Sequence, residues 1–361
     1  KVERYPLGDI SRHSNRTGAK RSPMFLQHNA GKRSICVDIK QPDGLEIVRG
    51  LCAKADVVIQ AFTPGTMDRL GLGYETLKAA NPGIIMCSIS GFGQTGRNAN
   101  RPGYAHLAHS MAGWLSMQFV HRDPPETPRG PGIAIADTTT GLTAFGAVGA
   151  ALYRKAMTGE GDHLDIALFD SLYGSNDSSL QTYLTNGEID VWYHPVHATK
   201  DGYVTALAGP DHASWRRACV AMGQPELAED PHFCDQKSLT GHLDEAAAIM
   251  QDWLASVTCA EAEQALTENH VPCGIVYTID QAARQPQVTD RGLTVTVNDP
   301  LLGKHDQINS AFKYENAESG VRGPAPMLGE HNAEVLREEL GYDDERIARL
   351  QADAVLQEKQ M

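Results

Sequence analysis

The stretch ADVVIQAFTPGTMDRLGLGYETLKAANPGIIMCSISGFGQTG, residues 55–96, decides the fold. It contains two short apolar runs, at 56–62 and 84–90, with a helical pattern between them. Short apolar runs rich in β-branched residues are typical of buried parallel strands. A strand, a helix and a second strand in this order form a right-handed crossover. The stretch therefore predicts part of a parallel sheet that is covered by helices.

The same alternation extends on both sides of this stretch. Further strands are expected at 34–40 and 163–169, and a helix at 41–55 with a proline near its start. The opening residues KVER have the pattern of the end of a strand, so a doubly wound domain would lack its first strand and helix. We predict an α/β fold with a doubly wound, mostly parallel sheet whose N-terminal strand and helix are missing.

A second, smaller domain is expected after the helical stretch at 168–184, where turn formers begin to mix with aromatic residues. It would be an α+β domain with helices near 211–222, 242–255 and 259–268. Two closing helical stretches would return to the first domain. The predicted boundaries are 1–188 for the large domain, 189–312 for the small α+β domain and 313–361 for the C-terminal helices.

Composition indicates an ordinary soluble protein, with 41% hydrophobic and 21% charged residues among 361. No run of about 18 apolar residues is present, and the first residues have no apolar core of a signal peptide. The seven cysteines are scattered without a CxxC pair, which favours reduced thiols over a disulfide or zinc framework. We predict a cytoplasmic enzyme that does not bind a membrane.

Charge is distributed unevenly along the chain. The net charge of −13 argues against a nucleic-acid partner. Residues 1–40, however, carry nine basic and three acidic side chains, a local surplus of 9 − 3 = 6 positive charges. Two interpretations stay open: a binding site for a small anionic ligand, or an exposed basic loop.

Two motifs suggest ligands that the surrounding sequence does not support. GFGQTG, residues 91–96, fits the dinucleotide pattern GxGxxG, but Asn98, Asn100 and Pro102 interrupt the helix that an NAD site requires. The histidine pairs in HLAH (106–109) and HPVH (194–197) have no third ligand at metal spacing. Neither NAD nor a metal is expected.

Asp137 interrupts the apolar run GIAIADTTTGLTAFG, residues 132–146. In one interpretation it is the N-cap of the helix that follows, because aspartate is favoured at that position. In the other it is a nucleophile. A helix N-terminus favours the anionic carboxylate, and a carboxylate in an apolar, glycine-lined pocket can attack an activated acyl group. The two interpretations are compatible, and the local sequence leaves both open.

Eight blocks, in the same order along the whole chain, resemble the class III (CaiB/BaiF) CoA-transferases. The resemblance implies a CoA-binding α/β domain, a smaller second domain and a homodimer of two interlocked, ring-like chains. It also implies that CoA is carried as a substrate, between an acyl-CoA and a small carboxylic acid. The blocks are KVERYPLGDISR, GKRSICVDIKQPDG, ADVVIQAFTPGTMDRLGLGYETLKAANPGIIMCSISGFGQTG, RPGYAHLAHSMAG, IADTTTGLTAFGAVGAAL, HATKDGYVTALAG, VPCGIVYTIDQAARQPQVTDRG and PMLGEHNAEVLREELG.

The resemblance also assigns roles to single residues. The family's nucleophilic aspartate falls on Asp137, which would form an acyl-aspartyl anhydride and then an aspartyl-CoA thioester. Arg4 and Arg69 match arginines of the family that contact the adenosine phosphates of CoA. The resemblance is chemically reasonable, because the planar guanidinium of arginine binds a phosphate through two parallel hydrogen bonds. The remaining matches are Lys40 at the nucleotide end, Val37 and Leu70 beside the adenine, Tyr104 near the reacting end and Arg101 among the CoA contacts.

Several expectations at this site are less specific. Arg97, Arg101 and Arg129 suggest a second carboxylate on the substrate. Backbone N–H groups in 91–96 and 139–141 are candidates to stabilise an oxyanion. Two other functions stay open: an α-methylacyl-CoA racemase, and a non-catalytic acyl-CoA-binding subunit. The racemases have His-Asp where Tyr104 and Ala105 stand, which favours the transferase because racemisation needs a base on each face of the α-carbon.

Overall fold

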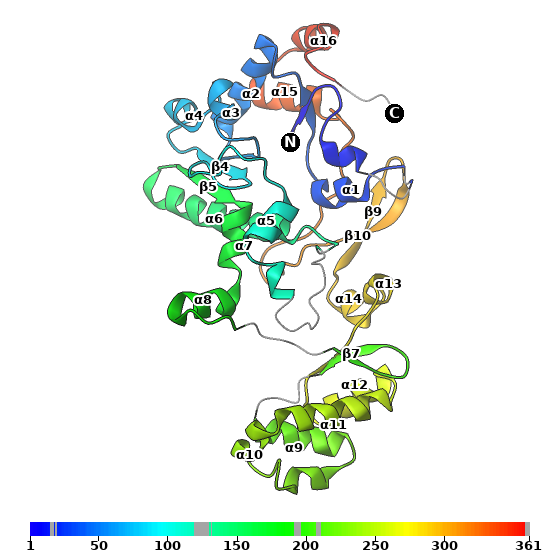
Figure 1. Ribbon diagram of the computed structural model, residues 1–361. Helices are drawn as coiled ribbons and strands as arrows, with labels where there is room; N and C mark the ends of the chain where they lie inside the picture. The colour runs from blue at the N-terminus through cyan, green and yellow to red at the C-terminus, as the bar shows by residue number, and fades with distance from the viewer. Residues whose placement is uncertain are drawn as a thin grey trace. The chain divides into compact units, whose positions relative to one another are not determined.

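The computed structural model describes residues 1–14, 18, 20–118, 130, 132–190, 196–206 and 211–357. The chain forms two compact units, and each is treated by itself (Figure 1). The first unit consists of Lys1–Asp190 and Arg291–Met361, and the second of Val191–Asp290. The sequence prediction instead extends the smaller domain to residue 312.

The first unit contains two parallel sheets. Strand β1 (Val2–Arg4) pairs with β2 (Ile35–Val37), and β4 (Ile85–Ser90) lies between β3 (Val57–Gln60) and β5 (Asp162–Ala167). All of these pairs are parallel. The expected α/β fold with parallel sheets is therefore confirmed, but β1 and β3 are not paired, so the strands of the described residues do not form one continuous sheet.

The central strand β4 shows why an apolar run predicted a buried strand. Its first residues, Ile85, Met86 and Cys87, are all buried, because both faces of the strand are covered. Helices α2 (Pro42–Lys54) and α4 (Tyr74–Ala80) contribute Val48, Cys52 and Leu77 to one side of this core. The short helix α3 (Thr66–Arg69) follows β3 and adds Met67.

The two C-terminal helices pack on the N-terminal part of this unit. Leu336 of α15 (Asn332–Leu340) and Leu350 of α16 (Asp344–Ala352) share a core with Ile47 of α2 and with β2. Residues from opposite ends of the chain therefore build one hydrophobic core.

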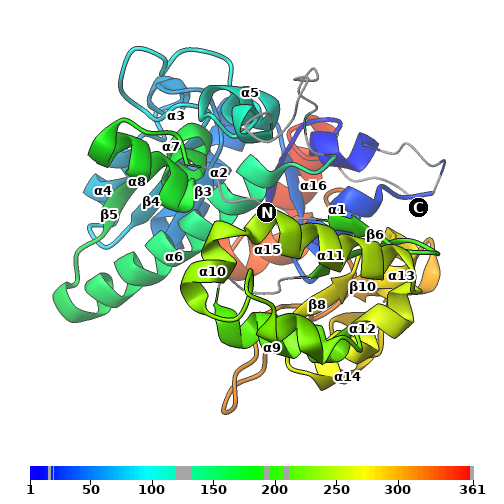
Figure 2. The same ribbon diagram turned by 60° about the horizontal axis from the view of Figure 1, so that its bottom comes forward.

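Four helices form the part of the first unit that carries the candidate nucleophile (Figure 2). They are α5 (Ala105–Met111), α6 (Ile135–Thr158), α7 (Leu168–Gly174) and α8 (Asp177–Asn186). The starts of α6 and α7 pack on α5 through Ala108, Ala136 and Leu172. The helical stretch predicted at 168–184 is broken at residues 175–176, and Asp177, which begins α8, has a positive φ of 46°.

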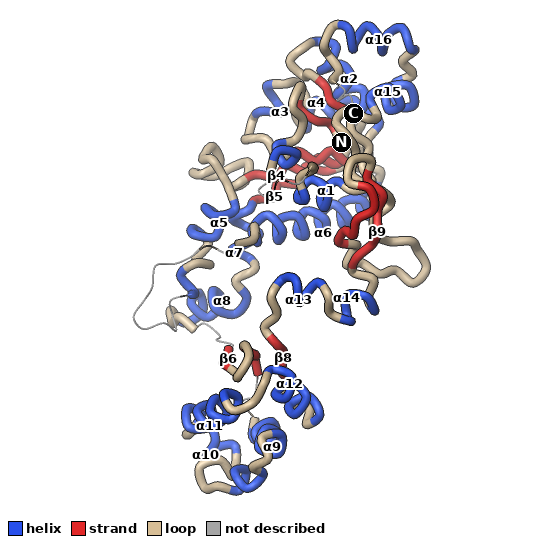
Figure 3. The backbone as a smooth tube through the Cα atoms, turned by 90° about the vertical axis from the view of Figure 1, so that its right-hand side faces the viewer, coloured by secondary structure: helices blue, strands red, loops and turns tan. Residues whose placement is uncertain are grey.

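The hairpin of β9 (Thr294–Asp299) and β10 (Gly303–Ile308) is antiparallel and belongs to the first unit (Figure 3). Asp299 at its turn is buried and forms an ion pair with Arg21. The guanidinium of Arg21 also donates to the carbonyls of Ala325 and Pro326. These bonds connect the hairpin to both ends of the chain, which explains why the predicted boundary at 312 differs from the observed one.

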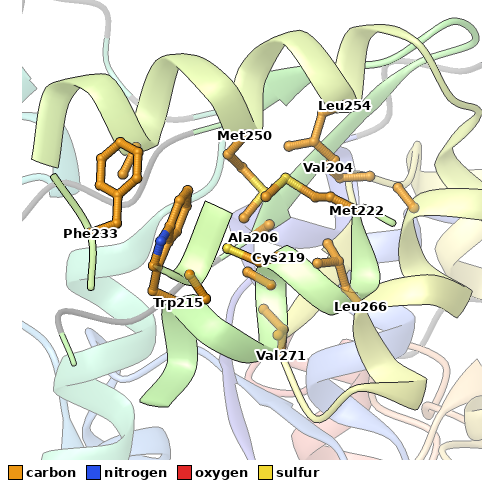
Figure 4. Close-up of a cluster of buried hydrophobic side chains, with 14 of the residues drawn as sticks. Val204, Ala206, Trp215, Cys219, Met222, Phe233, Met250, Leu254, Leu266 and Val271 are labelled. Carbon is orange, nitrogen blue, oxygen red and sulfur yellow. The ribbon is translucent and has the colours of Figure 1, made fainter. Parts of the chain in front are cut away.

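The second unit combines a small antiparallel sheet with helices. Its sheet has the order β6 (Val196–Ala198), β7 (Tyr203–Ala206), β8 (Cys273–Ile275). Helices α9 (His212–Ala221), α11 (Leu243–Ala255) and α12 (Cys259–Glu268) enclose a core around Trp215 (Figure 4). Among the described residues of both units, the remaining short helices are α1 (Pro23–Asn29), α10 (Gln236–Gly241), α13 (Ile279–Ala283), α14 (Pro286–Asp290), and the 3-10 helices η1 (Ile10–His13), η2 (Ser116–Gln118) and η3 (Pro225–Glu229).

The structure also bears on two sequence features, the lack of a long apolar run and the scattered cysteines. Within the described ranges, no helix combines the length and the apolar character needed to span a membrane. All seven cysteines are free thiols, as the sequence predicts, and only Cys234 is exposed.

Candidate active site

Asp137 lies in the first turn of α6, three residues into the helix rather than at its cap. The N-cap is Ala134, whose side chain makes no capping hydrogen bond. The N-cap interpretation of Asp137 is therefore wrong. The carboxylate is exposed and has no hydrogen-bond or ion-pair partner in the described part of the chain. It stands at the positive end of the longest helix, which stabilises an anion.

The start of α6 is held by the preceding helix. The backbone N–H of Ala136 donates to Nε2 of His109 over 3.1 Å. Both residues are buried, and the His109 ring stacks on Trp114 with 5.8 Å between ring centroids. Burial lowers the pKa of His109, and the neighbouring Asp137 carboxylate acts in the opposite direction. The sequence pattern does not predict this contact of His109 with the start of α6.

Tyr104 begins the same helix that holds α6. It is the N-cap residue of α5, its side chain is 65% exposed, and its ring stacks on His106. Helix α5 packs against the first turn of α6, which contains Asp137. Tyr104 therefore stands at the start of a helix that is a direct neighbour of the Asp137 turn.

The GFGQTG turn follows the carboxyl end of β4 and lies against the RPGY segment. A Cβ atom on Gly91 would overlap the backbone of Gly103, so the two chains touch. The N–H groups of Gly93 and Gln94 already donate to Ser90 Oγ (2.9 Å) and to the Asp165 carboxylate (2.9 and 3.0 Å). These two groups are therefore not free for an oxyanion.

The expected oxyanion donors in residues 139–141 are also engaged. Residues 139–141 lie inside α6, where backbone N–H groups bond to carbonyls four residues earlier. The expectation for this segment is wrong.

The expected CoA contacts at the N-terminal sheet differ in exposure. Arg4 and Val37 are register partners at the carboxyl ends of β1 and β2. Arg4 is exposed, whereas Val37 is 1% exposed and its side chain belongs to the core. Lys40 is exposed three residues after β2, with its N–H bonded to Asp38. Arg4 and Lys40 are therefore accessible to a ligand, and the Val37 side chain is not.

Arg69 and Leu70 close the short helix α3. Arg69 is exposed, and its guanidinium donates to Thr66 Oγ1 over 2.8 Å. Leu70 lines an apolar cavity of about 680 Å³ that is also lined by Val2 of β1 and Ile59 of β3. In the described residues none of Arg4, Lys40 and Arg69 has an acidic partner, so these cations are free to meet phosphates.

Arg101 lies beside the GFGQTG turn. Its guanidinium is 5.7 Å from the centroid of the Phe92 ring, and the residue is exposed. Arg97, on the same turn, is exposed as well. Arg129 and His194 lie outside the described residues.

Much of the positive surplus of residues 1–40 is neutralised within the fold. Arg12 binds the buried carboxylate of Glu3, Arg21 binds Asp299, and Arg33 bonds to three glutamates of α15. The charge argument for an anionic ligand is therefore weaker than the sequence indicates. The acidic partners of Arg21 and Arg33 could not be predicted, because they lie 278 to 306 positions away in the sequence.

One group of metal-ligand type occurs among the described residues, and it lies in the second unit. His232, His242 and Glu245 present ligand atoms within 4.8 Å of one another. The two imidazole rings are stacked at 4.2 Å with an angle of 3° between their planes. A histidine binds a metal in the plane of its ring, and two stacked parallel rings do not share a plane. The group is an exposed His–Glu contact of 2.8 Å with a second ring stacked on it.

The first unit combines parallel sheets, an exposed carboxylate in the first turn of a long helix, and cations near strand ends that have no acidic partner among the described residues. Comparison with known proteins identifies the class of protein. The model of CoA-transferase family III matches residues 1–332, and the chain belongs to this family. It is a CoA-transferase.

Relatives and solved structures agree with this assignment. The chain is 30% identical to succinyl-CoA–D-citramalate CoA-transferase of Chloroflexus aurantiacus, over 97% of this chain and 88% of the relative. It is 31% identical to mouse succinyl-CoA:glutarate CoA-transferase, over 99% of this chain and 84% of the relative. A crystal structure of a CaiB/BaiF family protein from Brucella suis superposes with a TM-score of 0.80 at 30% identity, covering 94% of this chain and 91% of that one.

Proposed function

We propose that this CoA-transferase moves CoA from an acyl-CoA to a free carboxylic acid through covalent adducts of Asp137. The observation that carries the proposal is the exposed, unpartnered carboxylate of Asp137 in the first turn of α6. A nucleophile must reach the substrate and stay anionic, and this position meets both requirements.

The reaction proceeds in four balanced steps. An oxygen of Asp137 attacks the thioester carbonyl, the C–S bond breaks, and CoA leaves as the thiolate. The thiolate attacks the aspartyl carbonyl of the resulting anhydride and releases the donor acid, leaving an aspartyl-CoA thioester. The acceptor carboxylate then attacks this thioester and forms a second anhydride. Finally the thiolate attacks the new acyl carbonyl, which yields the product and frees Asp137.

Binding of CoA is proposed to use the exposed cations of the first unit. Arg4, Lys40 and Arg69 have no acidic partner among the described side chains, and phosphates require such cations. Leu70 lines the apolar cavity and suits the adenine. Tyr104 and Arg101 are proposed to lie at the reacting end, since Tyr104 caps α5 and Arg101 lies beside Phe92.

The acceptor class is proposed to be a short dicarboxylic acid. The matched relatives are named for succinyl-CoA with citramalate or glutarate. A second carboxylate needs a cation outside the CoA site, and the exposed Arg97 and Arg101 are the candidates on the described turn. The racemase alternative has less support, because Tyr104 stands where a histidine base is required.

Two further proposals concern the assembly of the protein into a homodimer and an additional strand in the parallel sheet. An interlocked homodimer is supported by the apolar side chains that α6 exposes, among them Leu142 and Tyr153. A parallel strand and a helix that complete the sheet are supported by the gap between β1 and β3, because both strands line the same apolar cavity. A cytoplasmic location stays a prediction.

Oxygen labelling tests the mechanism directly. When the acceptor acid carries oxygen-18 in its carboxylate, the four steps transfer one labelled oxygen to Asp137. After a single turnover, mass spectrometry of the peptide that contains residue 137 should show this oxygen. Asp137→Asn should lose CoA exchange from succinyl-CoA by about 10³-fold or more.

The matched control is Asp244→Asn, which changes another exposed aspartate in the first turn of a helix, α11. It should exchange CoA at the wild-type rate. An unlabelled wild-type peptide, together with normal exchange by Asp137→Asn, would refute the proposal. If oxygen-18 is found on another residue, that residue and not Asp137 is the nucleophile.

A further inference from the structure

His109 contacts the first turn of α6 through a bond that fixes its own protonation state. The Ala136 N–H can only donate, so Nε2 of His109 must present its lone pair at the 3.1 Å contact. The ring is then neutral and carries its proton on Nδ1. A histidine that is 3% exposed and stacked on Trp114 has little freedom to turn away from this contact.

The bond replaces a cap that α6 does not have. The first N–H groups of a helix lack partners inside the helix, and a side chain at the N-cap usually accepts from one of them. Here the N-cap is Ala134, which has no side-chain acceptor. His109 supplies the acceptor from another helix and bonds to the residue directly before Asp137.

The surrounding core makes this contact rigid. Ala108 and Ala136 are both buried, and such small side chains bring the backbones of α5 and α6 close together. Leu172 of α7 packs against the same cluster. The position of the first turn, and with it the Asp137 carboxylate, is therefore set by the His109 bond and by tight packing.

We propose that His109 is a positioning residue for Asp137: its neutral ring holds the first turn of α6, and protonation of the ring releases that turn. The cation would have an N–H at both nitrogens and would oppose the Ala136 N–H. This inference rests on the proposed role of Asp137 as the nucleophile.

Few charged groups act on the ring. From α6 the Asp137 carboxylate favours the cation, and from α5 the neighbouring His106 disfavours it. The described part of α7 contributes no charge that acts on His109, although Asp170 lies in its first turn. Burial disfavours the cation further, so the neutral ring is the resting form.

Two substitutions separate the acceptor from the bulk of the side chain. His109→Gln places an amide oxygen near the position of Nε2 and cannot titrate, whereas His109→Leu fills the space without an acceptor. His109→Leu should lower kcat for CoA exchange by about 10²-fold, the effect of a small misplacement of a reacting group, with KM for the acyl-CoA changed less than about threefold. His109→Gln should keep kcat within about fivefold of wild type.

The pH profile provides a readout that packing alone would not change. In wild type, kcat should fall at acidic pH as His109 becomes protonated. In His109→Gln this acidic fall should move to lower pH, because the side chain at position 109 then no longer titrates. His197→Leu is the matched control, since it removes another buried histidine, bonded to Gln251 in the second unit. It should leave the profile unchanged.

The outcomes are distinct. A folded His109→Leu with wild-type kcat, or a His109→Gln as slow as His109→Leu, overturns the positioning role. An acidic fall that is identical in wild type and His109→Gln overturns the role of ring protonation, and this measurement remains possible if His109→Leu does not fold. Failure of the proposed function differs from these results, because the wild-type peptide containing Asp137 would then take up no oxygen-18.

Discussion

Glu3 illustrates how a single side chain can join several segments in the N-terminal part of the first unit. Its carboxylate is buried and accepts hydrogen bonds from the Arg12 guanidinium (2.6 and 2.7 Å), from Ser34 Oγ (2.6 Å) and from the Asp9 N–H (3.0 Å). Burial acts to raise the pKa of Glu3, but these bonds outweigh it and the pKa lies below its ordinary value. The residue therefore stabilises the fold as an anion.

Glu3→Gln should lower the free energy of unfolding by about 3–5 kcal/mol, because it leaves the Arg12 charge without its buried partner. Urea denaturation at neutral pH measures this change. The control Glu338→Gln removes an exposed partner of Arg33 and should cost less than about 1 kcal/mol. Equal effects of the two substitutions would contradict the anchoring role of Glu3.

The pH dependence follows from the sign of the same pKa shift. The folded-state pKa of Glu3 is below the unfolded one, so its contribution is present above the unfolded pKa and is lost as pH falls through the folded pKa. As pH falls below about 4.3, the ordinary pKa of a glutamate, the stability of wild type should therefore fall more steeply than that of Glu3→Gln. Parallel slopes would indicate that Glu3 does not titrate in this way.

Secondary-structure elements could be predicted where the local pattern is sufficient. The apolar run at 84–90 gave β4, and the pattern at 41–55 gave α2, because strand and helix periods are visible in the sequence. The break between α7 and α8 and the alanine N-cap of α6 were missed. Both depend on packing, which overrides local propensity at element ends.

The turn between β4 and α5 should tolerate no side chain at its contact point. Gly91→Ala places a methyl group against the backbone of Gly103, and neither chain can yield without moving the Tyr104 segment. We expect a loss of stability of about 1–3 kcal/mol together with slower CoA exchange. Gly174→Ala is the control, because it lies at the end of α7 with open space around it, and it should be neutral or slightly stabilising. Wild-type stability and activity in Gly91→Ala would show that the contact is not tight.

At the scale of the whole molecule, α6 and α8 expose an unusual amount of apolar surface. Leu142, Tyr153 and Met157 of α6 are all more than half exposed, and no described side chain of α8 is buried. A large exposed apolar patch of this kind marks a contact with another molecule. A second copy of the chain accounts for it in the proposed homodimer.

The double substitution Tyr153→Glu and Met157→Glu should convert the dimer to a monomer, because two charges would be buried in an apolar interface. Light scattering measures the mass in solution. Val220→Glu, on an exposed position of α9, is the control and should leave the mass unchanged. A wild-type protein that is monomeric, or a double variant that stays dimeric, would contradict the proposed use of this surface.

The sequence by itself determined the α/β class, most helices and strands, the family, and the location of Asp137 at the start of a helix, because these depend on local periodicity and on motifs. Tertiary structure alone decided the gap between β1 and β3, the neutralisation of Arg12, Arg21 and Arg33, and the contact between His109 and Ala136. Each of these joins residues that no local pattern relates. Burial and hydrogen bonding at such contacts arise only when distant segments of the chain pack together.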